Sequence, residues 1–224
     1  MNSGITERLT EVKAQLPEGV SLVAVSKYHP EEMIAEAYEA GQRVFGESHE
    51  QELSKKQASL PKDICWHFIG HLQTNKVKYI APYITMIEAV DTPKLLREIN
   101  KQALKNHRVI DVLLELHIAE EETKYGFTID ECRQWLSEGE WRQLEGVRIC
   151  GLMMMASYTD NSRQIEQEFS SAYQFYNELK QTVMADAPYF NIRSWGMSYD
   201  YLQAIACGSN MVRVGTKIFG ERVY

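Results

Sequence analysis

The sequence lacks the features that mark exported, membrane-bound or nucleic-acid-binding proteins. Residues 1–16 alternate charged and apolar side chains where a secretory signal would need a continuous apolar stretch. Like charges form no long run, and the formal net charge is −7 with a pI near 5.5. We therefore expect a cytoplasmic protein without nucleic-acid or membrane partners.

Closely spaced cysteine pairs are also missing. The four cysteines are scattered without any Cys-x-x-Cys spacing: Cys65, Cys132, Cys150 and Cys207. This spacing disfavours a zinc or redox centre, and we expect buried free thiols in a reducing compartment. His67 and His71 are four residues apart in an extended segment without an evident third ligand, so we expect no metal and interpret His67 as a core histidine.

No Pro/Gly/Ser-rich linker, internal repeat or low-complexity segment divides the chain. With 224 residues, 44% of them hydrophobic, the chain can bury one sizeable core, so we expect a single domain over residues 1–224. An open doubly wound sheet, the alternative fold, usually has a Gly-rich turn after its first strand. Here VSKYHP occupies that place.

Eight short apolar runs alternate with stretches of helical periodicity. The runs are 21–25, 43–45, 66–69, 85–90, 109–116, 147–153, 190–192 and 210–214. The helical stretches are 31–40, 51–58, 76–81, 92–106, 129–137, 163–184 and 199–207, with a short closing turn at the end. Thr92 followed by Pro93 predicts a helix start, and Gly41 predicts a helix stop. This order predicts a single (β/α)8 TIM barrel.

In such a barrel the active site forms at the carboxyl ends of the strands. The residues that follow the predicted strands are mostly polar: Lys27, Glu47, Ser48, His71, His117, Ser194 to Ser198, Arg213, Gly215 and Thr216. Met153 to Met155 end the sixth run and are typical of core filling, although one could lie under a flat ring. Lys124 and Gly126 follow the fifth strand, where we favour a solvated loop.

Lys27 directly follows the apolar run LVAV and Ser26. A partly desolvated amine has a lowered pKa and a larger neutral fraction, which suits condensation with a carbonyl group. At the other end of the chain, GSNMVRVGT (208–216) and GMS (196–198) supply backbone N–H groups and hydroxyls after the seventh and eighth strands. That is the common phosphate site of this fold.

Several segments together resemble the pyridoxal phosphate homeostasis protein family, whose barrel is similar to the N-terminal domain of bacterial alanine racemase. They are AVSKYHP, AGQRVFGESHEQEL, WHFIGHLQTNKVKYI, TKYGF, GLM and SWGMSYDYLQAIACGSNMVRVGTKIFG, and they cover almost the whole chain in order. The resemblance implies that the barrel holds pyridoxal 5′-phosphate (PLP), the active form of vitamin B6, as a Schiff base on Lys27.

The resemblance also implies the other cofactor-binding residues. Ser198, Gly215 and Thr216 would bind the phosphate, and Arg213 would face the pyridine nitrogen. Met197, beside Gly196, would line the cofactor's edge. Three positions depart from the family pattern: Ser48 replaces an asparagine, His117 an asparagine and Trp195 a methionine. We expect these departures to affect cofactor access or partner choice.

An arginine at the pyridine nitrogen disfavours the protonated ring and weakens the electron sink. Only eight residues follow Thr216, so we expect no second domain of the kind that completes alanine racemase. We therefore favour a monomeric carrier over an enzyme. It would buffer PLP, exchange it with free amino acids and deliver it to PLP-dependent apoenzymes, with effects on amino-acid and keto-acid pools.

Two other interpretations stay open. One is a PLP-dependent amino-acid racemase or decarboxylase of narrow activity, for which His71 and His117 are the candidate second bases inside the barrel. The other is a Schiff-base aldolase that acts on a sugar phosphate, for which Glu47 is the available acid/base candidate.

Overall fold

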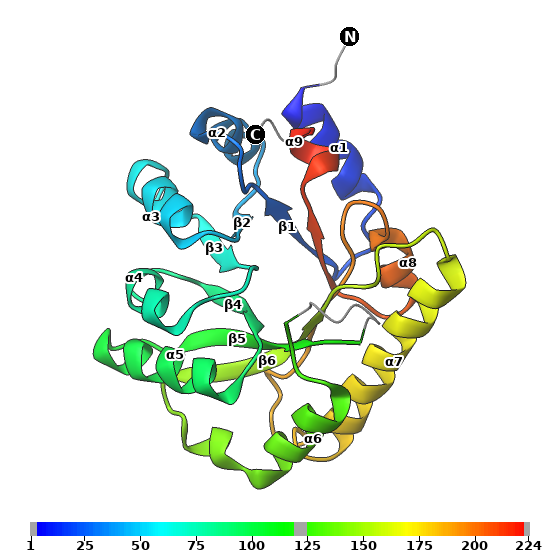
Figure 1. Ribbon diagram of the computed structural model, residues 1–224. Coiled ribbons are helices and arrows are strands. Elements are labelled where there is room, and N and C mark those ends of the chain that lie inside the picture. The colour runs from blue at the N-terminus through cyan, green and yellow to red at the C-terminus, as the bar shows by residue number, and fades with distance from the viewer. Residues whose placement is uncertain (1–3, 119–124, 222–224) are drawn as a thin grey trace.

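In the computed structural model, which describes residues 4–118 and 125–221, the strands close into a parallel barrel. They run in the order β1-β2-β3-β4-β5-β6-β7-β8, and β8 pairs with β1. Figure 1 shows helices around the outside of the sheet, so the predicted barrel is confirmed. The strands are β1 (Ser21–Val25), β2 (Val44–Glu47), β3 (Cys65–Phe68), β4 (Met86–Val90), β5 (Ile110–Leu116), β6 (Val147–Met154), β7 (Ile192–Ser194) and β8 (Met211–Val214).

The helices follow the predicted alternation closely. They are α2 (Glu31–Glu39), α3 (Glu50–Ser59), α4 (Val77–Ile80), α5 (Pro93–Lys105), α6 (Ile129–Glu138), α7 (Ser162–Gln181), α8 (Tyr201–Ala206) and α9 (Thr216–Phe219), with 3-10 turns η1 (Thr74–Lys76) and η2 (Glu140–Gln143). Thr92 caps α5 by accepting from the Leu95 N–H, with Pro93 at the first helical position. Gly41 has φ +86 after α2, as the predicted helix stop requires.

Two parts of the sequence prediction need correction. Helix α1 (Ile5–Ala14) precedes the barrel, packs against α9 and was not predicted from the charged and apolar alternation of this segment. Strand β7 begins at Ile192, whereas the apolar run predicted residues 190–192. The reason is that Phe190 is fully buried in the outer core, before the chain joins the sheet.

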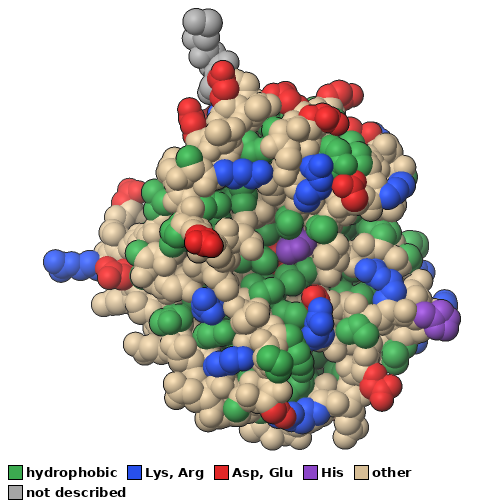
Figure 2. Space-filling view, turned by 180° about the vertical axis from the view of Figure 1, so that it is seen from behind, with side chains coloured by type: hydrophobic (Ala, Val, Ile, Leu, Met, Phe, Trp, Pro, Cys, Tyr) green, Lys and Arg blue, Asp and Glu red, His purple; other side chains and the backbone are tan. Residues whose placement is uncertain are grey.

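The apolar core lies mainly between the barrel and its helices, and a small second cluster lies inside the barrel. Polar side chains complete the interior: His67, Glu88, Ser194 and Arg213 are all buried there and bonded to one another. No helix within residues 4–118 and 125–221 is both long and apolar enough to cross a bilayer. On the face seen in Figure 2, acidic and basic side chains are interspersed rather than gathered by sign.

The cysteines agree only in part with the expectation of buried thiols. Cys132 and Cys150 are buried, and burial raises the pKa of each thiol to about 12, so both are unreactive at neutral pH. Cys65 and Cys207 are only partly buried, because they lie at a strand start and after a short helix.

Candidate functional site

Lys27 lies in the loop that leaves the carboxyl end of β1. Ser26 before it is completely buried, Lys27 itself is half-buried, and Tyr28 after it has the left-handed φ of +66. The Ser26 N–H donates to Gly46 O at 3.0 Å, and the His29 N–H closes the turn on Ser26 O at 3.1 Å. The loop therefore holds a primary amine at the rim of the barrel.

The loops after β7 and β8 meet beside the end of β1, which leads into the Lys27 loop. The Gly215 N–H donates to Ser198 Oγ at 3.1 Å, and Ser198 is buried. A Cβ at Gly215 would lie 3.0 Å from Val25 O, which puts this glycine against β1 two residues before Lys27. Helix α9 starts at Thr216, so its first N–H groups have no carbonyl partner within the helix. The structure thus brings the predicted lysine and the predicted anion ligands to one end of the barrel.

Arg213 lies in the interior below these loops. Its Nη1 donates to Ser194 O and Ser194 Oγ, both at 2.7 Å, and its Nη2 donates to Met154 O at 2.9 Å. Among the described residues, these bonds occupy three of the five guanidinium N–H groups. Burial lowers the pKa of Arg213 from its ordinary value, but an arginine starts high enough to stay charged near neutral pH. Arg213 is therefore a fixed positive charge below the rim loops, with two guanidinium N–H groups that could donate to a ligand.

His67 and Glu88 form the inner support of that cation. His67 Nδ1 lies 2.6 Å from Glu88 Oε1, Ser194 Oγ donates to Glu88 Oε2 at 2.6 Å, and Arg213 Nη1 is 3.9 Å from the same carboxylate. Burial alone would raise the pKa of Glu88, but the bond to His67 and the nearby positive charges hold it below its ordinary value. The expectation that His67 is a satisfied core histidine is confirmed.

His71 belongs to a separate polar group at the ends of β3 to β5. Its Nδ1 lies 2.7 Å from Asp91 Oδ2, and its ring stacks on Tyr125 with centroids 3.7 Å apart. Glu115 is also buried at this end, and its Oε2 has no hydrogen-bond partner among the described residues. Burial, and then the neighbouring charge of Asp91, raises the pKa of Glu115 to about 8. At neutral pH this carboxyl group is mostly protonated.

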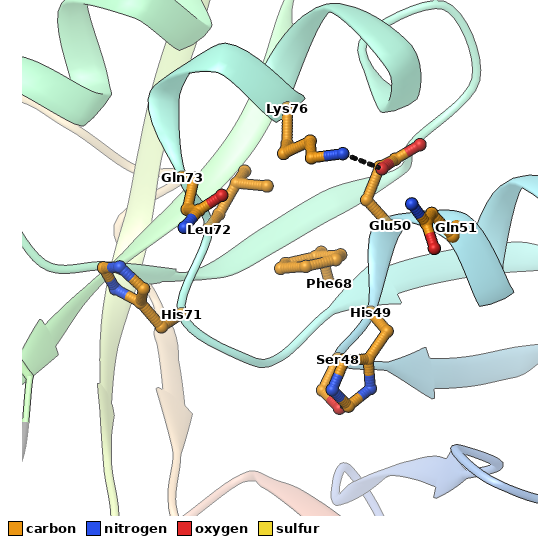
Figure 3. A pocket seen from close by; sticks show the side chains of 9 residues that line it. All are labelled: Ser48, His49, Glu50, Gln51, Phe68, His71, Leu72, Gln73 and Lys76. Carbon is orange, nitrogen blue, oxygen red and sulfur yellow. Dashed lines mark hydrogen bonds and ion pairs between the residues drawn. The ribbon is translucent and has the colours of Figure 1, made fainter.

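Two cavities flank the rim. One, of about 260 Å³, includes Ser48, Phe68 and His71 in its lining. Lys76 and Glu50 also line it and form an ion pair (Figure 3), with Lys76 Nζ 3.2 Å from Glu50 Oε2. The other, of about 480 Å³, includes Met197 and lies between the loops after β6 and β7. Ser48, after β2, and Met197, after β7, therefore border different cavities. Ser48 Oγ lies 3.2 Å from His49 Nδ1 and the Met197 N–H donates to Asp200 Oδ1 at 2.6 Å, and the part of both residues in cofactor binding stays a prediction.

The remaining sequence candidates differ in their surroundings. Glu47 is the last residue of β2 and is fully buried, where it bonds to Ser26 and Lys56, so it is not exposed at the rim as an acid/base group. Trp195 is fully buried in the outer core and cannot touch an external partner. His117 is half-buried, with its backbone N–H donating to Phe127 O at 2.8 Å. Lys124 lies outside the described residues.

Sequence reasoning missed three acidic residues of the site, Glu88, Asp91 and Glu115. A signal was available for two of them, because Glu88 and Glu115 interrupt otherwise apolar strands and charged residues are rarely buried without a role or a partner. The methionines Met153 and Met154 are buried, as core filling predicts.

Comparison with known proteins identifies the family. A family model described as "Alanine racemase, N-terminal domain" matches residues 3–223. The pyridoxal phosphate homeostasis protein of Aquifex aeolicus is 36% identical, over 99% of this chain and 97% of that protein. The human protein of the same name is 35% identical, over 98% of this chain and 85% of its own length. The chain belongs to the pyridoxal phosphate homeostasis protein family.

Solved structures agree with this family assignment. PipY of Synechococcus elongatus, solved without PLP, is 37% identical, covers 96% of this chain over its whole length and superposes with a TM-score of 0.89. The same protein has been solved with PLP bound, with a TM-score of 0.86. Alanine racemase of Clostridium difficile is 16% identical with a TM-score of 0.75, and this chain covers 59% of it, which shows a shared barrel fold.

For this family member, replacing Glu115 by Gln should remove a pH-dependent loss of stability. The carboxyl pKa is about 8 in the folded protein against 4.5 ordinarily, so between these values the folded state holds a proton that the unfolded state has released. Wild-type stability therefore falls as pH rises through this window, by roughly 3 to 4 kcal/mol relative to Glu115→Gln between pH 5 and 8. Urea unfolding of both proteins across this range measures the difference. Parallel curves would mean that Glu115 is ionised in the fold.

Proposed function

We propose that this protein binds PLP as a Schiff base on Lys27 and takes part in intracellular PLP homeostasis. The proposal depends on three groups at one end of a closed barrel: the half-buried amine of Lys27, the anion cradle formed by Ser198, Gly215 and Thr216, and the buried Arg213. The 36% identical PipY, solved with PLP bound, supports the same choice of ligand.

The residues present fit this ligand. Ser198, Gly215 and Thr216 would hold the phosphate, because hydroxyl and backbone N–H groups converge there. Arg213 would donate a hydrogen bond to the pyridine nitrogen from one of its N–H groups that has no acceptor among the described residues. Ser48 and Met197 would border the cofactor on two sides, since each lines one of the two cavities next to the rim. PLP, when bound, supplies an electrophilic carbonyl carbon and an electron-withdrawing ring.

Lys27 is the best nucleophile among the described lysines near the mouth. The side chain of Lys56 is 3% exposed, and Lys76 lines the cavity with Ser48 and His71 on the other side of β2. Lys217 is exposed in α9, with its Nζ over the ring of Tyr201. Lys27 alone combines partial burial with a place next to the anion cradle.

The buried arginine favours a carrier over an enzyme. Because Arg213 keeps its proton, it would donate to an unprotonated pyridine nitrogen and leave the ring a weak electron sink. We propose that free amino acids exchange with Lys27 and that PLP-dependent apoenzymes are the recipients, with consequences for amino-acid and keto-acid pools. On this proposal the protein acts as a cytoplasmic, single-domain monomer.

The His71–Asp91 hydrogen bond supports a second candidate, a narrow PLP-dependent amino-acid racemase or decarboxylase. A carboxylate that holds Nδ1 fixes the tautomer and leaves Nε2 to move a proton. Deuterium exchange at the Cα of single amino acids, scored against Lys27→Arg, separates the two functions. Exchange that depends on both Lys27 and His71 would favour the enzyme.

Borohydride reduction followed by peptide mass mapping tests the proposed function. The purified protein is mixed with PLP, reduced, digested and compared with an unreduced sample. We expect one phosphopyridoxyl adduct, on the peptide that contains Lys27. The proposal fails if no adduct forms or if the adducts are spread over exposed lysines.

A further inference from the structure

The backbone on both sides of Lys27 is tied to one cluster of charges, in which Glu47 and Lys56 are buried and Glu52 is partly exposed. On the preceding side, Ser26 Oγ donates to Glu47 Oε1 at 2.5 Å, and Ser26 O accepts from Lys56 Nζ at 2.9 Å. On the following side, the Tyr28 N–H donates to Glu52 Oε1 at 2.6 Å. These partners come from the end of β2 and from α3, so two neighbouring elements hold the loop that carries the amine.

Lys56 connects the two halves of the cluster. Its side chain is 3% exposed, and its Nζ donates to Ser26 O, to Glu47 Oε1 at 2.8 Å and to Glu52 Oε1 at 2.6 Å. An ammonium group has three N–H donors, so all of them are used. Any movement of Ser26 or Glu52 would leave a buried cation with an unmet donor, which is costly.

The cluster is poorly explained by stability alone. Replacing a buried ion pair with apolar side chains is often neutral or stabilising, because removing charges from water costs free energy. Here the cost is visible at Glu47, whose Oε2 has no partner among the described residues and whose pKa is raised to about 7 by burial. What the cluster gains is a set of directional bonds to the residues next to Lys27.

The loop also needs such restraint. Tyr28 has φ +66, in the left-handed region that aromatic residues rarely adopt, so the local backbone does not favour this conformation by itself. The bond from its N–H to Glu52 fixes the peptide at that position. Without it, the backbone after Lys27 would sample other conformations, and the point from which the Lys27 side chain leaves the loop would no longer be fixed.

We propose that Glu47, Glu52 and Lys56 form a clamp that positions Lys27 for reaction with its carbonyl ligand. The clamp residues act through the backbone of Ser26 and Tyr28, so they are positioning residues. The proposal rests on the proposed function for the role of Lys27, but the clamp itself can be observed without any ligand.

Two measurements on matched variants test the clamp. Lys56→Met removes the central cation, Glu52→Ala removes the acceptor of the Tyr28 N–H, and Lys55→Met is the control, because Lys55 is 82% exposed on the same helix. The first measurement is amide hydrogen exchange of the peptide spanning residues 26–30 in the unliganded protein. The second is the rate at which PLP forms the reducible adduct on Lys27.

We expect Lys56→Met and Glu52→Ala to exchange about tenfold faster in residues 26–30 and to form the adduct several times more slowly. Glu52→Gln, which keeps an oxygen for the Tyr28 N–H, should restore most of the protection, and Lys55→Met should match the wild type. Folded variants with wild-type exchange and wild-type adduct rates would overturn the proposal. If the wild type forms no adduct on Lys27, the proposed function fails while the exchange comparison still decides the clamp.

Discussion

Lys27→Arg is expected to abolish the borohydride-stable adduct completely. A guanidinium group keeps the positive charge of the lysine but cannot supply a neutral amine near neutral pH, so no Schiff base can form. The substitution is on a half-buried loop outside the core, and we expect its free energy of unfolding to change by less than about 1 kcal/mol. Peptide mass mapping and urea unfolding measure the two quantities.

The comparison with Lys217→Arg makes this result specific. Lys217 is exposed in the first turn of α9, close to the proposed phosphate ligands, and should be dispensable for the covalent bond. If Lys27→Arg keeps a single stoichiometric adduct on another lysine, the assignment of the amine is wrong. Loss of the adduct in both variants would indicate that α9, rather than Lys27 chemistry, limits binding.

Arg213→Met is expected to destabilise the fold by about 3–5 kcal/mol, because it removes a buried cation and leaves the Glu88 carboxylate, among the described residues, with His67 and Ser194 as its remaining support. Arg213 is 4% exposed and Glu88 is fully buried, with the two side chains 3.9 Å apart. The carbonyls of Ser194 and Met154 would also lose a donor. Denaturant unfolding measures the loss.

Two further variants test whether the loss of stability comes from the buried position of Arg213, or whether losing any arginine would have the same effect. Arg97→Met breaks an exposed pair with Glu140, at 2.6 Å, and should cost no more than about 1 kcal/mol. Combining Arg213→Met with Glu88→Gln should recover part of the stability, since the buried carboxylate that has lost this cation is then removed. A loss in Arg213→Met as small as that in Arg97→Met would show that Glu88 is neutralised in another way.

The fold was readable from the sequence because its pattern is regular. Each strand is a short apolar run followed by a helical period, and boundaries such as Thr92 with Pro93 have a local chemical cause. Local pattern was less useful where tertiary packing decides. Phe190 resembles a strand residue in the sequence but packs in the core outside the barrel. The segment that forms α1 has only a weak apolar pattern, and its few apolar residues are buried where the helix packs against α9.

From the sequence, the site was predictable at the rim and, through the family resemblance, at Arg213 in the interior. Lys27, Ser198 and Gly215 each follow an apolar run, so the topology of a barrel brings them to one end. The side chains that bond to residues around the rim could not be predicted in this way. Examples are Asp91, which bonds to His71, and Lys56, which bonds to Ser26, because the directions of their side chains depend on tertiary packing. A buried lysine in a polar helix such as α3 looks the same in the sequence as its exposed neighbour Lys55.

The pairing of β8 with β1 has a consequence for synthesis of the protein. During translation Lys27 is made well before Gly215 and Thr216, and domains generally fold as units. Arg8 of α1 likewise cannot form its hydrogen bond to the backbone of α9 until Ile218 has been made, because Arg8 Nε donates to Ile218 O at 2.7 Å. Under the proposed function, an incomplete barrel would have the Lys27 amine without Ser198, Gly215 and Thr216, so only a completed barrel would hold a reactive aldehyde stably.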